Sequence, residues 1–349
     1  MEKLKVGILK EVKAGEGRVI LTPEEVKKLY SIFSNIEIYV SKGAGEQAGY
    51  YDSNYSDQAH IVDNNFIWEN CDLVLKVKEP LPEEIKKAKF GQRIVAFIHT
   101  PALDYLKPAI EEKKLQIFAL DRWERDGVDD PLSEMSKIAG EVGANLGIMA
   151  LETKLIYNSK RFGYVSSDKK ANAMIIGSAG QVGRVATEVL ARQDIFNKIV
   201  CVDHQNHSFS RYIDGRPLII NKKQFSLDSL ADADLIICGA RVPGQSASKI
   251  LTAKEVEFLK DGVVIVDMAI DEGGNFEYSY PQKPNESPRI VMVRGKEIVL
   301  ISIPNLPGTV PRVSTPAISR AAFPFVKSII ETFQSNESFP EDVLKTLII

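Results

Sequence analysis

The stretch from Ala171 to Asp203, ANAMIIGSAGQVGRVATEVLARQDIFNKIVCVD, constrains the fold of this chain more than any other. A short apolar run predicts a strand, three glycines follow at once, and helix-forming residues and a second apolar run complete a β-turn-α-β unit. Glycine at such a turn lets the backbone bend sharply. It also lets a pyrophosphate approach the helix N-terminus, where unpaired N–H groups and the helix dipole favour negative charge. The stretch therefore predicts a dinucleotide-binding unit.

The glycines of this turn are spaced G-x-x-G-x-x-G, one residue longer than G-x-G-x-x-G, and the second apolar run ends on Asp203. That acid lies somewhat beyond the usual interval of roughly 20 residues. An acid at this place can accept hydrogen bonds from both adenosine ribose hydroxyls, and it repels a 2′-phosphate. We therefore predict NAD as the cofactor, bound by Gly177, Ser178, Gly180, Gln181, Val182, Gly183 and Asp203.

Apolar runs and helical segments alternate along the whole chain, which favours parallel sheets with helices on both faces. Strands are predicted at 4–9, 36–40, 73–78, 93–98, 115–120, 217–220, 235–238 and 263–268, with a hairpin over 290–301. Helices are predicted from Thr22-Pro23, over 131–161, over 226–231, over 252–260 and from Thr315 to about Phe333. In such sheets, ligands bind outside the carboxyl ends of the strands.

Length and composition limit the remaining possibilities. A chain of 349 residues suggests two domains, at roughly 150 residues per domain. The net charge of −3 and the absence of a basic run argue against nucleic acid as a partner. No apolar run of 18 residues and no signal peptide are present, so we expect a cytoplasmic protein without a membrane span. Cys71, Cys201 and Cys238 lie in or beside apolar runs and are expected to be buried free thiols. The four histidines show no metal-ligand spacing, so no metal site is predicted.

Four charged or titratable residues follow predicted strands or glycine-rich loops. They are Arg18, Lys78, His99 and Asp271. Each alone could be a solvated charge, a structural histidine or a turn cap. Their shared placement at the mouths of loops favours a functional site.

The chain resembles a family that contains alanine dehydrogenase and the NAD-binding subunit of proton-translocating transhydrogenase. The resemblance covers nearly the whole chain and rests on VGILKEVKAGEGRVILTPEEV, GAGEQAG, DLVLKVKEPLPEE, AFIHTPA, PLSEMSKIAG, the glycine-rich turn, ADLIICGARVPG, VIVDMAIDEGG and PNLPGTVPRVST. It implies two Rossmann-like, doubly wound α/β domains with the active site in a cleft between them. The first domain, 1–130 plus 306–349, would hold substrate, and 131–305 would bind NAD. It also places Ser136, Gly239, the 242–244 loop and Asn305 near the cofactor.

The two branches of this family differ at residues that this chain retains. Alanine dehydrogenases carry the lysine and histidine that match Lys78 in KVKEP and His99 in FIH, and transhydrogenase subunits lose both. The segment WERDGVDDPLSEM matches the transhydrogenase loop poorly, although SKIAG leans that way. Asp121 stands where the family commonly has glutamate, which leaves alanine itself open as the substrate. The resemblance therefore implies an amino-acid dehydrogenase.

The chemistry of amino-acid oxidation suits these residues. Arg18 and Lys78 would neutralise the substrate carboxylate, His99 would move protons near neutral pH, and Asp271 would stabilise the imine or the attacking water. The expected reaction is oxidative deamination of a small, alanine-like L-amino acid to its 2-oxo acid and ammonia, and its reverse. Two alternatives stay open: a transhydrogenase-type NAD(H)-binding subunit, and an opine-type reductase that joins an amino acid to a 2-oxo acid. Relatives suggest a homo-oligomer, either a dimer or a hexamer.

Overall fold

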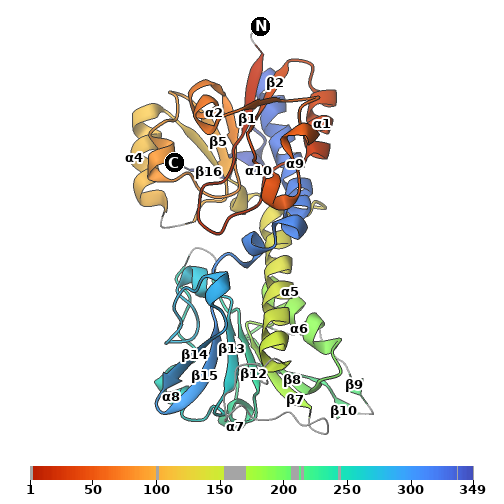
Figure 1. The fold of residues 1–349 in the computed structure, drawn as a ribbon, viewed down its shortest axis with the longest axis vertical. Coiled ribbons are helices and arrows are strands. Elements are labelled where there is room, and N and C mark those ends of the chain that lie inside the picture. The colour runs from red at the N-terminus through yellow and green to blue at the C-terminus, as the bar shows by residue number, and fades with distance from the viewer. Residues whose placement is uncertain are drawn as a thin grey trace. The chain divides into compact units, whose positions relative to one another are not determined.

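The structure is a computed structural model that describes residues 3–99, 102–152, 170–205, 212–213, 216–242, 245–335 and 337–348. It consists of two compact units (Figure 1). The first unit combines Met1–Met135 with Pro307–Ile349, and the second is Ser136–Leu306. The first unit is thus assembled from two separate stretches of chain.

The first unit contains a seven-stranded sheet of strand order β16-β6-β5-β4-β1-β2-β3. Its strands are β1 (Leu4–Ile8), β2 (Ile36–Ser41), β3 (His60–Val62), β4 (Leu73–Leu75), β5 (Arg93–Ala96), β6 (Gln116–Ala119) and β16 (Leu347–Ile348). All neighbours pair parallel except β16, which pairs antiparallel with β6. The helices of this unit are α1 (Pro23–Ile32), α2 (Asn64–Asn70), α3 (Pro82–Ile85), α4 (Leu103–Lys113), α9 (Pro311–Ser335) and α10 (Glu341–Leu344).

The second unit repeats this plan with strand order β11-β8-β7-β12-β13-β15-β14. Its strands are β7 (Ala171–Ile176), β8 (Phe196–Val202), β11 (Ile219–Lys222), β12 (Leu235–Cys238), β13 (Val263–Asp267), β14 (Arg289–Val293) and β15 (Lys296–Ile301). The predicted hairpin is β14 paired antiparallel with β15. Separate from this sheet, β9 (Tyr212–Ile213) pairs with β10 (Arg216–Pro217). Three helices, α6 (Gln181–Ala191), α7 (Leu227–Ala231) and α8 (Ala253–Val256), follow strands of the sheet, and α5 (Pro131–Glu152) leads into the unit.

Both sheets reverse direction at an equivalent place. In each unit the first strand is central: the chain winds outward on one side through the next two strands and then returns to the other side. The reversal falls between β1 and β4 in the first unit and between β7 and β12 in the second. In doubly wound sheets this switch point opens a crevice at the carboxyl ends of the strands, where ligands bind. The topology therefore predicts one ligand-binding crevice in each unit.

Small residues let α5 lie close to the elements of the second unit. A Cβ added at Gly140 would lie 2.5 Å from the carbonyl oxygen of Val182, and one at Gly147 would lie 2.9 Å from a methyl of Leu235. At Gly143 an added Cβ would overlap the sulfur of Met268. Further along the helix, Ala144, Ala150 and Leu151 join the core of this sheet. Figure 1 shows α5 and α6 beside β7, β8 and β12.

Several predicted boundaries were wrong. The strand predicted to reach Lys78 ends at Leu75, and β3 was not predicted. The helix predicted over 252–260 covers only Ala253–Val256. The last helix begins at Pro311 and continues through Pro316, because a proline so near a helix start removes only one backbone hydrogen bond. The predicted helix over 131–161 is seen to Glu152, and 153–161 lie outside the described residues.

Candidate active site

Lys78 and His99 lie side by side in the first unit, beyond the carboxyl ends of β4 and β5. Lys78 follows β4, and its Nζ lies 3.3 Å from His99 Nε2 on the segment after β5. Lys78 is only 6% exposed, whereas the side chain of His99 is 38% exposed, so the histidine is the member of the pair that solvent reaches. Two residues that lie 21 positions apart in the sequence are thus brought together at the carboxyl ends of neighbouring strands, as the sequence pattern predicted.

Glu79 fixes the histidine ring from its other side. His99 Nδ1 lies 2.8 Å from Glu79 Oε2, and Glu79 Oε1 accepts a hydrogen bond from Lys13 Nζ at 2.5 Å. Burial by itself raises the pKa of Glu79, but the hydrogen bonds and charges of His99 and Lys13 outweigh it and lower that pKa to about 2. An ionised carboxylate can only accept, so His99 Nδ1 donates the hydrogen bond to Glu79.

Arg18 lies on the loop after β1 and is held by a near neighbour. Its Nε donates to Glu16 Oε1 at 2.7 Å, its Nη2 donates to Glu16 Oε2 at 2.5 Å, and its Nη1 contacts the sulfur of Met135 at 3.0 Å. Arg18 is 3% exposed. This two-point pairing fixes the plane of the guanidinium, the group that was predicted to bind a carboxylate.

Asp121 supports the backbone next to His99. It is the shorter acid at a position where the resemblance led us to expect glutamate. It lies in the turn after β6, and its Oδ1 accepts a hydrogen bond from the backbone N–H of Ile98 at 2.7 Å. That N–H immediately precedes His99. The aspartate is thus placed to steady the segment that presents the imidazole.

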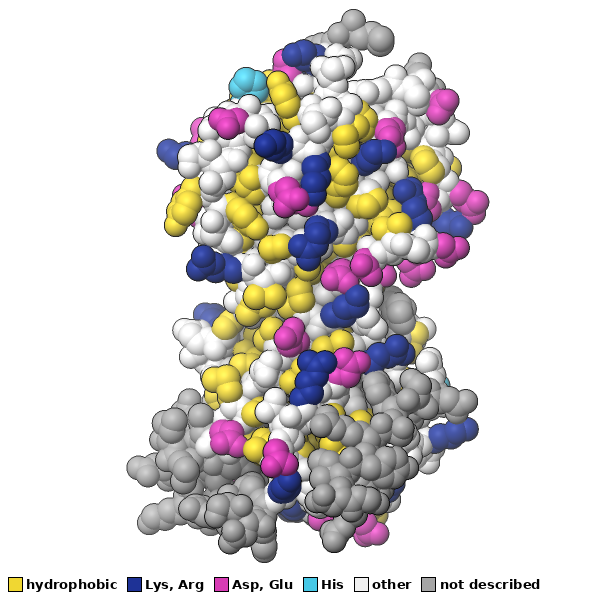
Figure 2. Space-filling view, turned by 90° about the vertical axis from the view of Figure 1, so that its right-hand side faces the viewer, with side chains coloured by type: hydrophobic (Ala, Val, Ile, Leu, Met, Phe, Trp, Pro, Cys, Tyr) yellow, Lys and Arg dark blue, Asp and Glu magenta, His cyan; other side chains and the backbone are white. Residues whose placement is uncertain are grey.

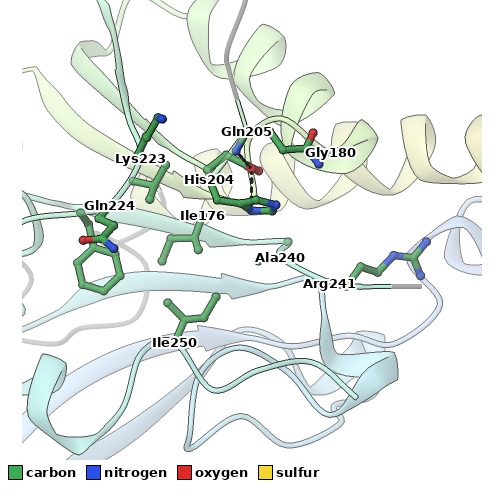
Figure 3. A pocket seen from close by; sticks show the side chains of 14 residues that line it. Ile176, Gly180, His204, Gln205, Lys223, Gln224, Ala240, Arg241 and Ile250 are labelled. Atoms are coloured by element: carbon green, nitrogen blue, oxygen red, sulfur yellow. Dashed lines mark hydrogen bonds and ion pairs between the residues drawn. The ribbon is translucent and has the colours of Figure 1, made fainter. Parts of the chain in front are cut away.

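The crevice of the second unit is a pocket over the glycine-rich turn. Its volume is about 520 Å³, and it is lined by residues after β7, β8, β11 and β12, among them Gly177, Gly180, Asp203, Lys223, Phe225 and Gly239 (Figure 3). Gly177 has a φ of +83°, and a Cβ there would lie 2.6 Å from the backbone of Ala240. Gly180 is the N-cap of α6. These glycines keep the turn narrow and its backbone accessible.

Asp203 lies at the end of β8 and is already tied to the loops around it. Its Oδ2 accepts from the N–H of Ala179 at 3.0 Å and its Oδ1 from the N–H of Gln205 at 2.9 Å. His204 Nδ1 lies 3.2 Å from Oδ1, the contact that Figure 3 draws as a dashed line. The carboxylate therefore joins the glycine-rich turn to the loop after β8.

The predicted cofactor residues do not all line this pocket. Gly177, Gly180, Asp203 and Gly239 do. Ser178 and Gly183 are buried behind the turn, Gln181 and Val182 begin α6, and Ser136 lies early in α5. Asn305 lies in the segment after β15. Of the 242–244 loop, the residues at 243 and 244 lie outside the described residues.

Asp271 and Asn305 are joined at another edge of the second unit. The backbone N–H of Asn305 donates to Asp271 Oδ2 at 2.9 Å, and Asn305 has a φ of +54°, which is uncommon for a residue other than glycine. Strain of this kind gathers at functional sites, where the surrounding structure enforces it. Next to Asp271, the carboxylate of Glu272 pairs with Arg241 at 2.7 Å.

Asn275 and Asp267, both buried, hold the Asp271 loop against the pocket wall. Asp267 accepts from the backbone N–H groups of Ala269, Asn275 and Phe276. The side-chain oxygen of Asn275 accepts a hydrogen bond from the N–H of Ala240 at 3.0 Å, and the side-chain nitrogen donates to the carbonyl of Ala240 at 2.8 Å. This side chain pairs with Ala240 as a neighbouring strand would. The pocket wall at Ala240 and the Asp271 loop are therefore held together by hydrogen bonds.

Sequence reasoning missed four of these residues: Glu16, Glu79, Met135 and Asn275. Glu79 and Glu16 stand beside predicted residues in KVKEP and GEGR, and an acid next to a functional base or arginine was the available signal. Met135 and Asn275 act through contacts across the fold, at 117 and 35 positions from Arg18 and Ala240 respectively. No local pattern marks such contacts.

Across the described ranges, His, Cys, Asp and Glu side chains form no group of three or more that could hold a metal ion. No helix in the described part of the chain is long and apolar enough to cross a membrane. The three cysteines are buried and free, as predicted, and burial raises the pKa of the Cys71 thiol to about 12. On the face in Figure 2, Lys and Arg side chains are interspersed with Asp and Glu.

Comparison with known proteins places the chain in a family. Residues 7–139 match the N-terminal domain model of alanine dehydrogenase/PNT, and residues 146–349 match its C-terminal domain model. The alanine dehydrogenase of Staphylococcus haemolyticus (strain JCSC1435) is 30% identical over 345 residues, covering 96% of this chain and 91% of that protein. The alanine dehydrogenase of Bacillus subtilis (strain 168) is 30% identical over 332 residues, covering 93% and 85%.

Solved structures agree with this placement. An L-alanine dehydrogenase has a TM-score of 0.82 at 26% identity, covering 99% of this chain and 95% of that one. A transhydrogenase from Sinorhizobium meliloti has a TM-score of 0.73 at 21% identity, covering 94% of each chain, and shares the fold. With both of its domain models matched and curated relatives aligned over nearly its full length, this chain belongs to the alanine dehydrogenase/PNT family.

Proposed function

We propose that this protein catalyses the NAD-dependent oxidative deamination of a small L-amino acid, alanine or one close to it, to the 2-oxo acid and ammonia, together with the reverse reductive amination. The observation that carries the proposal is the Lys78–His99–Glu79 arrangement, in which the lysine side chain and the imidazole are in contact at the carboxyl ends of two neighbouring parallel strands. Such a pair suits a substrate that carries both a carboxylate and a group that must gain and lose protons.

Each residue has a proposed role. The carboxylate of the amino acid is bound by Arg18, whose guanidinium plane Glu16 fixes, and by the ammonium of Lys78. His99 Nε2 takes the proton from the water that attacks the imine, while Nδ1 stays bound to Glu79. Asp271 stabilises the cationic imine, and its hydrogen bond from Asn305 fixes the orientation of the carboxylate.

The second unit suits NAD. The chemistry that NAD supplies when bound is acceptance of a hydride from Cα of the amino acid. Gly177 and Gly180 would let the pyrophosphate approach the N-terminus of α6, and Asp203 would accept hydrogen bonds from the adenosine ribose. A pocket of about 520 Å³ lined by these glycines fits one end of a dinucleotide.

The test is an assay of NADH formation with a panel of L-amino acids, and of NADH consumption with 2-oxo acids and ammonia. We expect alanine or a close homologue to support turnover without any second carbon substrate. Turnover that requires an amino acid and a 2-oxo acid together would instead indicate an opine-type reductase. Hydride transfer only in the presence of an NADP-binding partner protein would indicate the transhydrogenase type. Absence of turnover with the whole panel would refute the proposal.

Substitution of Asp203 by alanine should change cofactor choice. The carboxylate that accepts from the ribose is lost and the repulsion of a 2′-phosphate disappears, so we expect kcat/KM for NAD to fall about 10-fold and use of NADP to rise. Asp203 also binds the N–H groups of Ala179 and Gln205, so Asp203→Asn, which keeps an acceptor, is the matched control for loop disorder. The measurement is kcat/KM with each cofactor, and an unchanged NADP to NAD ratio in both variants would contradict the assigned role.

Glu79→Gln should lower kcat and leave cofactor binding intact. A neutral amide can offer either its oxygen or its NH₂ to His99 Nδ1, so the ring loses the single orientation that the carboxylate enforces. Because general acid–base catalysis contributes roughly 10²- to 10⁴-fold, we expect kcat to fall by at least about 10-fold. Steady-state kinetics gives kcat, and titration of NADH fluorescence gives cofactor affinity. A fall in NADH affinity equal to the fall in kcat would show general damage to the fold.

A further inference from the structure

A lysine lies fully buried beneath the proposed substrate residues. Lys76 is 0% exposed, and its Nζ lies 2.7 Å from Glu84 Oε2 and 3.7 Å from Glu11 Oε2. The side chains of Glu11 and Glu84 are 2% and 6% exposed. Buried ion pairs of this kind often add little to stability, because the loss of hydration offsets the attraction of the charges. The burial of these three charged side chains together therefore indicates a role other than stability.

Glu11 also binds the backbone that leads to Lys78. Its Oε1 accepts from the N–H of Val77 at 2.5 Å and from the N–H of Lys78 at 3.3 Å. The last backbone bond between these two segments is that from the Leu9 N–H to the Leu75 carbonyl. Beyond it, the carboxylate of Glu11 takes the place of a neighbouring strand. This replacement is why β4 ends at Leu75 and the chain continues in an irregular but fixed path.

We propose that Glu11 is a positioning residue for the substrate carboxylate: its ionised side chain holds the Val77–Lys78 backbone and thereby keeps the Lys78 ammonium in place against His99. The inference rests on the proposed function for its effect on substrate, but the hold on the backbone can be measured without turnover. Lys76 has a separate task in this arrangement. Lys76 balances the negative charge of Glu11, and its Nζ is itself held by Glu84, which caps α3 by accepting from the N–H of Leu81.

The charges around Glu11 make this hold sensitive to pH. Burial raises the pKa of Glu11 most; Lys76 and the Val77 hydrogen bond lower it, while Glu16 and Glu84 raise it, and the result is a pKa of about 7. Above that pH the carboxylate is ionised, and its bonds to the two N–H groups are charge-assisted. Below it the group is neutral and these bonds weaken. The hold on Lys78 is therefore strong in alkaline solution and is lost as the pH falls through about 7.

Glu11→Gln isolates the charge, because the amide oxygen keeps an acceptor for the same N–H groups. The first readout is hydrogen–deuterium exchange, by mass spectrometry, of a peptide containing Val77 and Lys78, in the full-length variant and in the native protein at matched pH. We expect exchange to be about 10-fold faster in the variant at pH 9 and equal in the two proteins at pH 5.5. Glu69→Gln, an exposed glutamate of α2 in the same unit, is the matched control and should exchange like the native protein.

The second readout is binding of propionate, which carries the carboxylate of alanine but has no amino group to oxidise. As a competitive inhibitor it should bind about 5- to 10-fold more weakly to Glu11→Gln than to the native protein at pH 9, and equally at pH 5.5. If the variant exchanges as predicted, but neither the variant nor the native protein turns over any amino acid, the proposed function is refuted and the inference about Glu11 still stands.

A second variant keeps the inference testable if Glu11→Gln does not fold. The double variant Glu11→Leu with Lys76→Met replaces the buried pair by apolar groups of similar size, which such sites often tolerate. We expect it to fold and to show fast exchange at Val77 and Lys78 at both pH values. Native-like exchange at pH 9 in either variant, or the same difference between Glu11→Gln and the native protein at pH 5.5 and pH 9, would overturn the assignment of Glu11.

Discussion

Replacement of His99 by alanine is expected to lower kcat by about 10²- to 10⁴-fold, the usual contribution of a general acid–base residue. The imidazole contacts Lys78 Nζ, Glu79 binds its Nδ1, and Asp121 binds the backbone N–H of the preceding residue, Ile98. The loss should fall on kcat, because the cofactor pocket belongs to the other unit and its residues are unchanged. Stopped-flow or steady-state formation of NADH measures the effect.

The control for this variant is another histidine of the same unit. His60 lies on β3 at the sheet edge and packs against the ring of Tyr39, with ring centroids 5.1 Å apart. His60→Ala should leave kcat within about 2-fold of the native value, since exposed residues away from a site change little. If His99→Ala keeps native turnover, or loses NADH binding to the same extent as turnover, then His99 has no role in proton transfer.

Two glycines of the same turn are expected to fail in different ways. At Gly183 an added Cβ would overlap the carbonyl oxygen of Gly177 and come within 2.7 Å of the Cα of Ser178, so both clashing neighbours are backbone. Backbone at this turn cannot move aside without breaking the packing of α6 on β7. Gly183→Ala should destabilise the second unit by about 3 kcal/mol or more, and the protein should express poorly or melt several degrees lower.

Gly180→Ala should fold normally and bind NAD poorly. The nearest atom to its added Cβ is the Gly177 oxygen at 3.4 Å, an ordinary contact, and its φ of −68° and ψ of 161° suit alanine. In the proposed complex, however, this Cβ would stand where the pyrophosphate approaches the helix N-terminus. We expect a native melting temperature and a dissociation constant for NADH raised about 10- to 100-fold, or about 1.4 to 2.7 kcal/mol. Thermal melting and NADH fluorescence measure the two properties.

The contrast between the two glycines tests the cofactor site directly. If Gly180→Ala binds NADH as tightly as the native protein, the pyrophosphate does not lie at the start of α6. If Gly183→Ala folds with a native melting temperature, the glycine-rich turn leaves room for a Cβ at position 183. The two outcomes are independent, because one depends on a bound ligand and the other on the protein alone.

The second unit was the more predictable from sequence, because its site is local. Gly177, Gly180 and Asp203 lie within one strand-turn-helix-strand unit, and the polypeptide between them dictates their spacing. The alternation of strands and helices predicted a parallel sheet, and the sheet of this unit is parallel except for β14. The loop after β13 was less predictable, since Asn275 reaches Ala240 across 35 positions.

The first unit was harder to predict because its site is assembled from distant segments. Two lysines of one short segment illustrate the difficulty. Lys76 is buried against Glu84 and Glu11, whereas Lys78 contacts His99, and both read in the sequence as charges at the end of an apolar strand. Only the three-dimensional positions of Glu11 and Glu84 separate the structural lysine from the proposed substrate lysine. The strand predicted to reach Lys78 ends at Leu75 instead, because the carboxylate of Glu11 binds the N–H groups of Val77 and Lys78, a contact that the sequence does not show.

The discontinuity of the first unit has a consequence for how the chain folds. Helix α9, which packs into this unit, is synthesised only after the whole of Ser136–Leu306. Within that inserted unit, Leu306 at its end lies close to Gly143 near its start, at 3.5 Å from an added Cβ. Once the insert has folded, its two ends are held close together, which removes most of the entropy cost of closing so long a loop. Folding of the insert should therefore precede and promote completion of the first unit, so lesions such as Gly183→Ala are expected to slow the maturation of both.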